Sequence, residues 1–172
     1  MTKTIIHFVL LFLAMVFVQL ICNRICLFNV AVPLVFIYFI IRLPLSLSTN
    51  WVITLSFLLG LTIDIFSNTL GMNALACTLI GALRKPTISL FFPREDEMSN
   101  PIPSIRTLGA GNYLKYMIAL TFIYCTLIFL IQAFTFYDFK LTVLRILGST
   151  LLTSVILFGF DSLATTRREK RL

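Results

Sequence analysis

One acidic side chain stands inside a long apolar stretch of this chain, and small polar residues follow it. Asp64 is followed by Ser67, Asn68 and Asn73, with Gly71 among them. An ionisable group in such surroundings is costly to desolvate, so it can mark a proton relay, a ligand site or a catalytic carboxylate. The structural alternative is an anchor, paired with a basic residue or capping the backbone N–H groups of the next turn. We favour the anchor.

A basic partner for this carboxylate is suggested by position along the chain. Arg145 lies one turn into the last apolar stretch, at the depth expected for Asp64 in the helix that carries it. A contact between the two side chains would neutralise two poorly solvated charges. We therefore hypothesise that Asp64 and Arg145 form a pair or border the same polar pocket.

Four further residues are candidates for helix contacts or partner binding. Gly60 and Gly71 are small enough to let two helix backbones approach closely. Gln19 and Asn73 place hydrogen-bonding groups among apolar neighbours, where such groups join helices more often than they bind a ligand.

Catalytic and metal-binding signatures are absent from the sequence. The single histidine, His7, lies far from Asp64 along the chain, and no zinc-protease, nucleophile-elbow or phosphate-loop motif occurs. The sequence thus predicts no catalytic residue, no cofactor and no metal, and a lipid-modifying enzyme has no supporting cluster.

The four cysteines all lie in or beside apolar runs, where cysteine acts as a small buried hydrophobe. A disulfide between Cys22 and Cys26 is the alternative if the connection between them faces an oxidising compartment.

The elements that must position these residues are membrane helices. Of the 172 residues, 59% are hydrophobic and only 12% are charged, and the mean hydropathy is +0.99. A soluble domain carries about 25% charged residues, so lipid must cover this chain. The net charge of +7 comes from basic residues at the ends of apolar runs, without the basic stripe of a nucleic-acid-binding surface.

The apolar runs predict an all-α membrane protein with one polytopic domain over residues 1–172, a compact bundle of about six transmembrane helices. The expected spans are residues 5–22, 25–41, 51–66, 69–83, 113–134 and 141–160. Pro33 is expected to kink the second span, and Pro86 to end the fourth.

The distribution of basic residues sets the expected orientation. With both termini in the cytoplasm, the loop 84–112 and the basic tail 161–172 lie inside, and only Arg24, Lys140 and Arg145 lie outside. Basic residues favour the cytoplasmic side of membrane proteins, so the sequence predicts a multi-pass protein of a bacterial inner membrane with both termini inside.

The segment from Gly60 to Leu75 resembles the rod shape-determining MreD family. That family has a glycine-containing apolar helix, an aspartate, a small polar turn and a Leu-Gly-x-x-Ala-Leu start to the next helix. Here these features are Asp64, Ser67 and the run from Leu70 to Leu75. Gln19 and Pro33 also fit the pattern, whereas Asn68 stands where a glycine is common and the loop 93–112 is long.

The resemblance implies a non-enzymatic subunit of the machinery for cell elongation and lateral peptidoglycan synthesis. Its implied partners are MreC and, through it, the MreB filament and the synthase pair of RodA and a penicillin-binding protein. The outer turn around Asp64 would meet a protein partner, and the basic loops would meet MreB or anionic membrane lipids.

A second function remains open from the same residues. The family is similar in architecture to the substrate-binding S-components of energy-coupling-factor transporters, which are compact six-helix bundles. Such a subunit has a polar pocket near its outer face, and Asp64, Asn73 and Arg145 are the residues expected to line one here.

Overall fold

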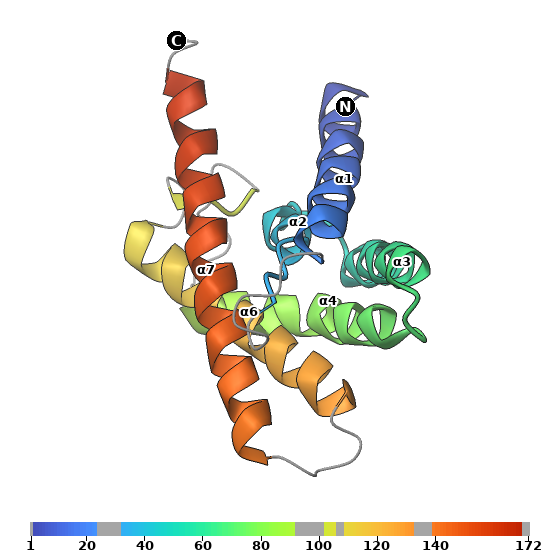
Figure 1. Ribbon diagram of the computed structural model, residues 1–172. Helices are drawn as coiled ribbons and strands as arrows, with labels where there is room; N and C mark the ends of the chain where they lie inside the picture. The colour runs from blue at the N-terminus through green and yellow to red at the C-terminus, as the bar shows by residue number, and fades with distance from the viewer. Residues whose placement is uncertain (1, 24–31, 92–101, 106–108, 133–138, 170–172) are drawn as a thin grey trace.

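The computed structural model describes residues 2–23, 32–91, 102–105, 109–132 and 139–169, and its regular elements are all helices. Six helices follow one another in these ranges, as Figure 1 shows. They are α1 (Thr2–Cys22), α2 (Ile37–Arg42), α3 (Thr49–Ser67), α4 (Met72–Phe91), α6 (Ala110–Gln132) and α7 (Phe139–Glu169). The predicted all-α class is confirmed for this part of the chain.

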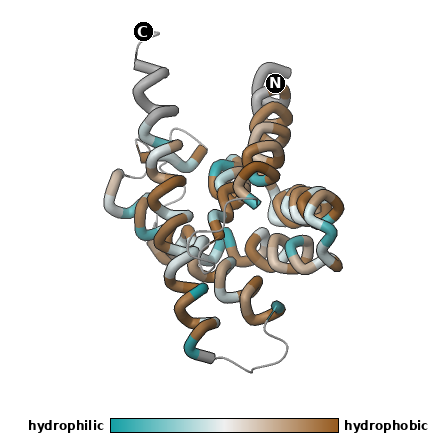
Figure 2. Tube along the Cα trace, in the orientation of Figure 1, coloured by the Kyte–Doolittle hydropathy of each residue, from teal (hydrophilic) through white to brown (hydrophobic). Residues whose placement is uncertain are grey.

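The lengths and surfaces of these helices are those of a multi-pass membrane protein. Four helices, α3, α4, α6 and the part of α7 from Lys140 to Ser162, are long and apolar enough to cross a bilayer, and Phe8–Cys22 of α1 is a shorter apolar helix. Large apolar side chains such as Phe17, Ile65 and Leu151 are exposed on the outside, and Figure 2 shows apolar residues along most of the long helices. Proteins that are surrounded by water rarely expose so much apolar surface, so lipid covers it.

The predicted helix over residues 25–41 is the main point at which the expectation was wrong. Residues 25–31 lie outside the described ranges, residues 32–36 are not helical, and α2 comprises only six residues. Pro33 has no N–H group and disfavours helical geometry in the residue before it, and it lies in the non-helical segment before α2 rather than inside a helix. The chain therefore reaches α2 as a non-helical segment, residues 32–36.

Side chains from distant helices supply the hydrogen bonds that this segment lacks. The backbone N–H of Val35 donates to the side-chain oxygen of Gln19 at 2.8 Å. The N–H groups of Val32 and Leu34 donate to hydroxyls of α7, those of Ser149 and Thr153, at 3.1 Å each. Within a membrane, non-helical backbone is stable only when it is buried in protein and satisfied in this way.

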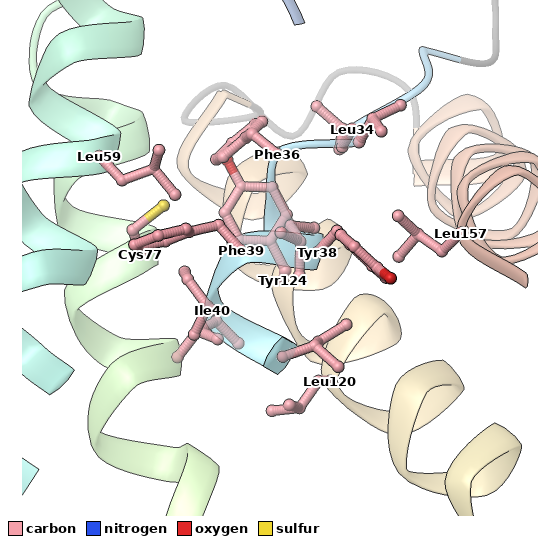
Figure 3. Packing of buried hydrophobic residues seen from close by; sticks show 14 of the residues in the cluster. Leu34, Phe36, Tyr38, Phe39, Ile40, Leu59, Cys77, Leu120, Tyr124 and Leu157 are labelled. Carbon is pink, nitrogen blue, oxygen red and sulfur yellow. The ribbon is translucent and has the colours of Figure 1, made fainter. Parts of the chain in front are cut away.

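Residues 32–42 run beside α7 in the same direction. Val32 contacts Ser149, Leu34 contacts Thr153, and Tyr38 reaches Asp161. With a helical rise of about 1.5 Å per residue, the stretch of α7 from Ser149 to Asp161 is about 18 Å long. Residues 32–42 thus cross a large part of the bundle, and Figure 3 shows their side chains packed between α4 and α7.

Helices α3 and α4 form the most extensive pair in the structure. Gly60 of α3 lies against the start of α4 so closely that an added Cβ would be 2.5 Å from the backbone oxygen of Asn73. The predicted role of Gly60 in close helix approach is confirmed. Gly81 has a similar role on the α4 side of this helix pair, where an added Cβ would be 2.9 Å from the hydroxyl of Ser56 on α3.

Helix α4 continues through Pro86 to Phe91, so the expected end of a span at residue 83 was wrong. Arg84, predicted to lie in a cytoplasmic loop, is only 1% exposed and donates to the backbone oxygens of Leu43 and Pro44. These bonds fix the last turns of α4 to the segment after α2. A proline in a membrane helix is tolerated where neighbouring segments hold the helix in this way.

The remaining boundaries differ less from the expected ones. Helix α6 begins at Ala110, so residues 110–112 are helical rather than part of the loop. Helix α7 continues to Glu169, so most of the predicted tail 161–172 is helical. Asp161 at the start of this extension is buried and pairs with Arg42 at 2.9 Å. The first turns of α1 and the last turns of α7 lie at the same end in Figure 1.

Replacing Gly60 with alanine should lower the free energy of unfolding by about 1–3 kcal/mol, because the new methyl group would overlap the backbone of α4. The thermal unfolding midpoint of the purified protein in mild detergent measures this loss. Gly159→Ala is the matched control, since nothing lies within 4 Å of a Cβ added there. An equal response of both variants would contradict the close α3–α4 contact.

Candidate functional site

The carboxylate of Asp64 is the centre of a hydrogen-bond network between α3 and α4. Its Oδ1 accepts hydrogen bonds from the hydroxyl of Thr69 and from the side-chain amide of Asn73, the latter at 2.9 Å. The backbone N–H groups of Asn73 and Ala74 donate to Oδ1 and Oδ2 at 3.2 and 2.8 Å. Asp64 is only 3% exposed, so these groups replace water around it.

Asp64 acts as the N-terminal cap of a helix other than its own. Helix α4 begins at Met72, so the residue before it, Gly71, has no side chain with which to cap the free N–H groups. The carboxylate of Asp64 reaches the second and third of these groups from the end of α3. Negative charge at a helix N-terminus is stabilising. Of the two readings of Asp64, the capping anchor is the one that this geometry confirms.

The network continues to a third helix through Asn73. Tyr124 of α6 donates its hydroxyl hydrogen to the side-chain oxygen of Asn73 at 2.6 Å, and both residues are buried. The expected role of Asn73 in joining helices is confirmed, as is that of Gln19, which links α1 to residues 32–36. Tyr124 escaped sequence analysis because a tyrosine in an apolar run gives no sign of where its hydroxyl will lie.

The turn between α3 and α4, residues 68–71, depends on two residues with positive φ. Asn68 adopts φ 54° and Gly71 adopts φ 76°, a region that asparagine and glycine enter most easily. Nothing lies within 4 Å of a Cβ added to Gly71. The expectation that Gly71 allows close helix approach was therefore wrong, and its backbone conformation is the reason for a glycine there.

The structure does not bring Asp64 and Arg145 together. Arg145 is exposed on α7, and among the described residues the ion pair recorded is that between Arg42 and Asp161. The four hydrogen bonds that the Asp64 carboxylate accepts come instead from Thr69 in the turn and from Asn73 and Ala74 of α4. The pairing hypothesis was wrong because sequence depth alone does not tell which faces of two helices meet.

A cavity of about 650 Å³ lies beside this network, at the ends of α1, α3 and α6. Leu34, Phe36 and Phe129 are among its apolar lining residues. Its polar lining residues carry only amides and hydroxyls: Gln19, Asn23, Ser67, Thr69, Asn73 and Gln132. Of the three residues predicted to line a pocket, Asn73 does so, whereas Asp64 and Arg145 are not among the described lining residues.

The buried and exposed polar groups of this cavity differ in their hydrogen bonding. The amide of Gln19 donates to Asn23 and Pro33 and accepts from two backbone N–H groups, so its capacity is filled. Asn73 donates to both Asp64 and Thr69. Asn23 and Gln132 are exposed, and the side-chain amide of Gln132 makes no hydrogen bond to any described residue. We call Gln19 and Asn73 the floor, and Asn23, Ser67 and Gln132 the rim.

A second polar cluster, formed by Tyr38, Arg42 and Asp161, lies at the other end of the bundle. Tyr38 donates to Oδ1 of Asp161 at 3.0 Å, and the Arg42 guanidinium lies 5.6 Å from the centre of the Tyr38 ring. Arg42 also donates to the backbone oxygen of Pro103 at 3.4 Å. This cluster ties α2, α7 and the connection before α6 together.

Within the described ranges, no three histidine, cysteine, aspartate or glutamate side chains gather in a group that could hold a metal ion. Cys77 and Cys125 are buried and Cys22 is half-buried, each as a free thiol. Cys26, and with it the possible disulfide to Cys22, lies outside the described residues. No family model, no curated protein and no solved structure matches this chain.

Replacing Asp64 with asparagine should lower the free energy of unfolding by about 1.5–3 kcal/mol, since hydrogen bonds to a charged acceptor are lost and an amide NH₂ faces backbone N–H donors. The unfolding midpoint in detergent measures the change. Arg145→Gln should leave the midpoint unchanged, because Arg145 is exposed.

Exchanging the charges of Asp64 and Arg145 tests directly whether these two residues interact. Combining Asp64→Arg with Arg145→Asp should restore none of the stability lost in Asp64→Arg alone. Recovery of the midpoint in the double variant would show that the two residues do interact.

Proposed function

We propose that this protein is a non-enzymatic subunit of the bacterial cell-elongation complex, resident in the inner membrane with both termini in the cytoplasm. In this role it works with MreC and, through it, with MreB and the synthase pair of RodA and a penicillin-binding protein. The support is the resemblance of residues 60–75 to the MreD family, together with a multi-pass helical fold. The concentration of basic residues on one side of the expected topology supports the orientation.

The observation that carries this proposal is the construction of the turn between α3 and α4. The hydrogen bonds of the Asp64 carboxylate go to that turn and to the first residues of α4, so they serve to hold a shape. The turn presents Leu70, whose side chain is 98% exposed, beside the exposed Ile65 and Phe66. A rigid turn with a projecting apolar side chain suits a contact with another protein.

In this mechanism the protein transmits position rather than performing a reaction. The outer turn meets MreC or the synthase, while basic residues at the cytoplasmic ends of the helices meet MreB or anionic lipid headgroups. The Asp64 network and the Tyr38–Arg42–Asp161 cluster each fix several helices at one end of the bundle. Such a bundle can hold two partners at a defined separation across the membrane.

One observation favours a second candidate, a small-molecule-binding subunit of an energy-coupling-factor-type transporter. The cavity at the ends of α1, α3 and α6 has a volume within the range of ligand pockets, about 300–1,000 Å³. It lies on the side that the expected topology places outside. A transport subunit in this role would assemble with an ATPase coupling module.

Leu70→Ser should reduce the recovery of MreC in a pull-down from native membranes in mild detergent, with quantification by mass spectrometry. Burying a leucine side chain contributes about 1.5–3 kcal/mol, so losing most of that burial at an interface should weaken binding by about 1–2 kcal/mol, or about five- to thirtyfold. Leu90→Ser is the matched control, because Leu90 is also exposed, at 77%, but lies near the far end of α4.

The identity of the captured proteins decides between the two candidates. Recovery of MreC and the elongation synthase that falls only in Leu70→Ser supports the scaffold. Recovery of an ATPase coupling module in place of MreC supports the transport subunit, and equal loss of MreC in both leucine variants would remove the turn from the interface.

A further inference from the structure

We propose that the cavity between α1, α3 and α6 binds an uncharged amphiphile, with its hydrocarbon body in the cavity and a hydrogen-bonding head at the rim. This inference concerns the isolated chain, so it holds with or without the partners proposed above. It rests on the shape of the cavity, on the absence of charge in its described lining and on the different states of its polar groups.

The cavity has the features of a binding site rather than of a packing defect. Its volume of about 650 Å³ exceeds the space that a few ordered waters need. One wall is the non-helical segment, from which Val32, Leu34 and Phe36 line the space. Breaks in membrane helices commonly form binding sites, because an irregular backbone is held only where protein or a cavity surrounds it.

The lining indicates the charge of the occupant. None of its described residues is acidic or basic. The nearest carboxylate, that of Asp64, is buried and already accepts from Thr69, Asn73 and Ala74. A phosphate, a carboxylate or an ammonium group would therefore enter without a counter-charge, at a high desolvation cost. An uncharged molecule avoids this cost.

The polar groups indicate how that molecule lies. At the floor, Gln19 and Asn73 use their amide hydrogens within the protein. At the rim, Asn23 uses one amide hydrogen on Ser67, and Gln132 uses none on any described residue. Free donors thus belong to the exposed lining residues, whereas apolar lining residues such as Leu34 and Phe129 are buried.

A molecule that is polar throughout, such as a sugar, would find too few partners at the floor. A pure hydrocarbon would leave the rim groups unused. An amphiphile satisfies both regions, because burial of its chain supplies the free energy and its head meets the amides. The surrounding membrane is the source that we infer, and a glycerolipid with an unphosphorylated head has this chemistry.

The test is native mass spectrometry of the purified full-length protein, released from detergent after incubation with 1-monooleoylglycerol. Oleate has the same chain with a charged head, and glycerol has the same head without a chain. We expect retention of monooleoylglycerol as a one-to-one adduct, at least fivefold more than oleate, and no glycerol adduct.

The rim is tested with a matched pair of variants on α6. Gln132→Ala removes the unused amide at the cavity and should reduce the monooleoylglycerol adduct about fivefold, the effect of one hydrogen bond. Asn112→Ala removes an exposed amide near the other end of the same helix and should leave the adduct unchanged. Both residues are exposed, so neither change should disturb folding.

Four results would overturn the proposal. Equal retention by the wild type and both variants would mean nonspecific lipid, and preference for oleate would contradict an uncharged site. Retention of glycerol, or no adduct at all, would exclude an uncharged amphiphile as the ligand of the cavity. Because no partner protein is present, none of these results bears on the recovery of MreC.

Discussion

A backbone N–H group inside a lipid bilayer must find its acceptor within the protein, and the course of residues 32–36 depends on this constraint. These residues are not helical, so their backbone N–H groups donate to Gln19 on α1 and to Ser149 and Thr153 on α7. Three separate parts of the chain are thereby fixed against one another. The same segment lines the cavity at the ends of α1, α3 and α6 through Val32, Leu34 and Phe36.

Two aspartates among the described residues are buried, and the protein compensates the loss of water around each carboxylate in a different way. Asp64 is surrounded by neutral donors, two of them backbone N–H groups at the start of α4. Asp161 is matched with the charged side chain of Arg42 and the hydroxyl of Tyr38. The first arrangement joins neighbours in sequence and shapes a turn, whereas the second joins residues about 120 positions apart and closes the bundle.

Much of this architecture could be predicted from apolar periodicity, and the failures have physical causes. The spans that became α3, α6 and α7 were found because lipid-facing helices need long apolar runs. The non-helical segment 32–36 was not predicted because a hydropathy pattern cannot distinguish a helix from a buried non-helical segment. Arg84 was expected in a loop because a charged side chain is costly to bury. The sequence does not show that backbone oxygens such as that of Leu43 accept its hydrogen bonds.

At the candidate site, sequence analysis identified Asp64, Asn73, Gln19 and Gly60 as important and gave the capping role of Asp64 as one of two readings. It could not identify Tyr124, and it assigned Arg145 to the wrong neighbours, because both depend on which faces of the helices meet. Gly71 was expected to allow close helix approach, whereas its positive φ shows that it serves the turn.

The hydrogen bonds from residues 32–36 to α7 also bear on biogenesis. They connect residues 117 and 119 positions apart, so the acceptors on Ser149 and Thr153 are synthesised long after the donors on Val32 and Leu34. Until α7 enters the membrane, the N–H groups of Val32 and Leu34 lack their final partners. Residues 32–36 therefore complete their native hydrogen bonding only after α7 inserts.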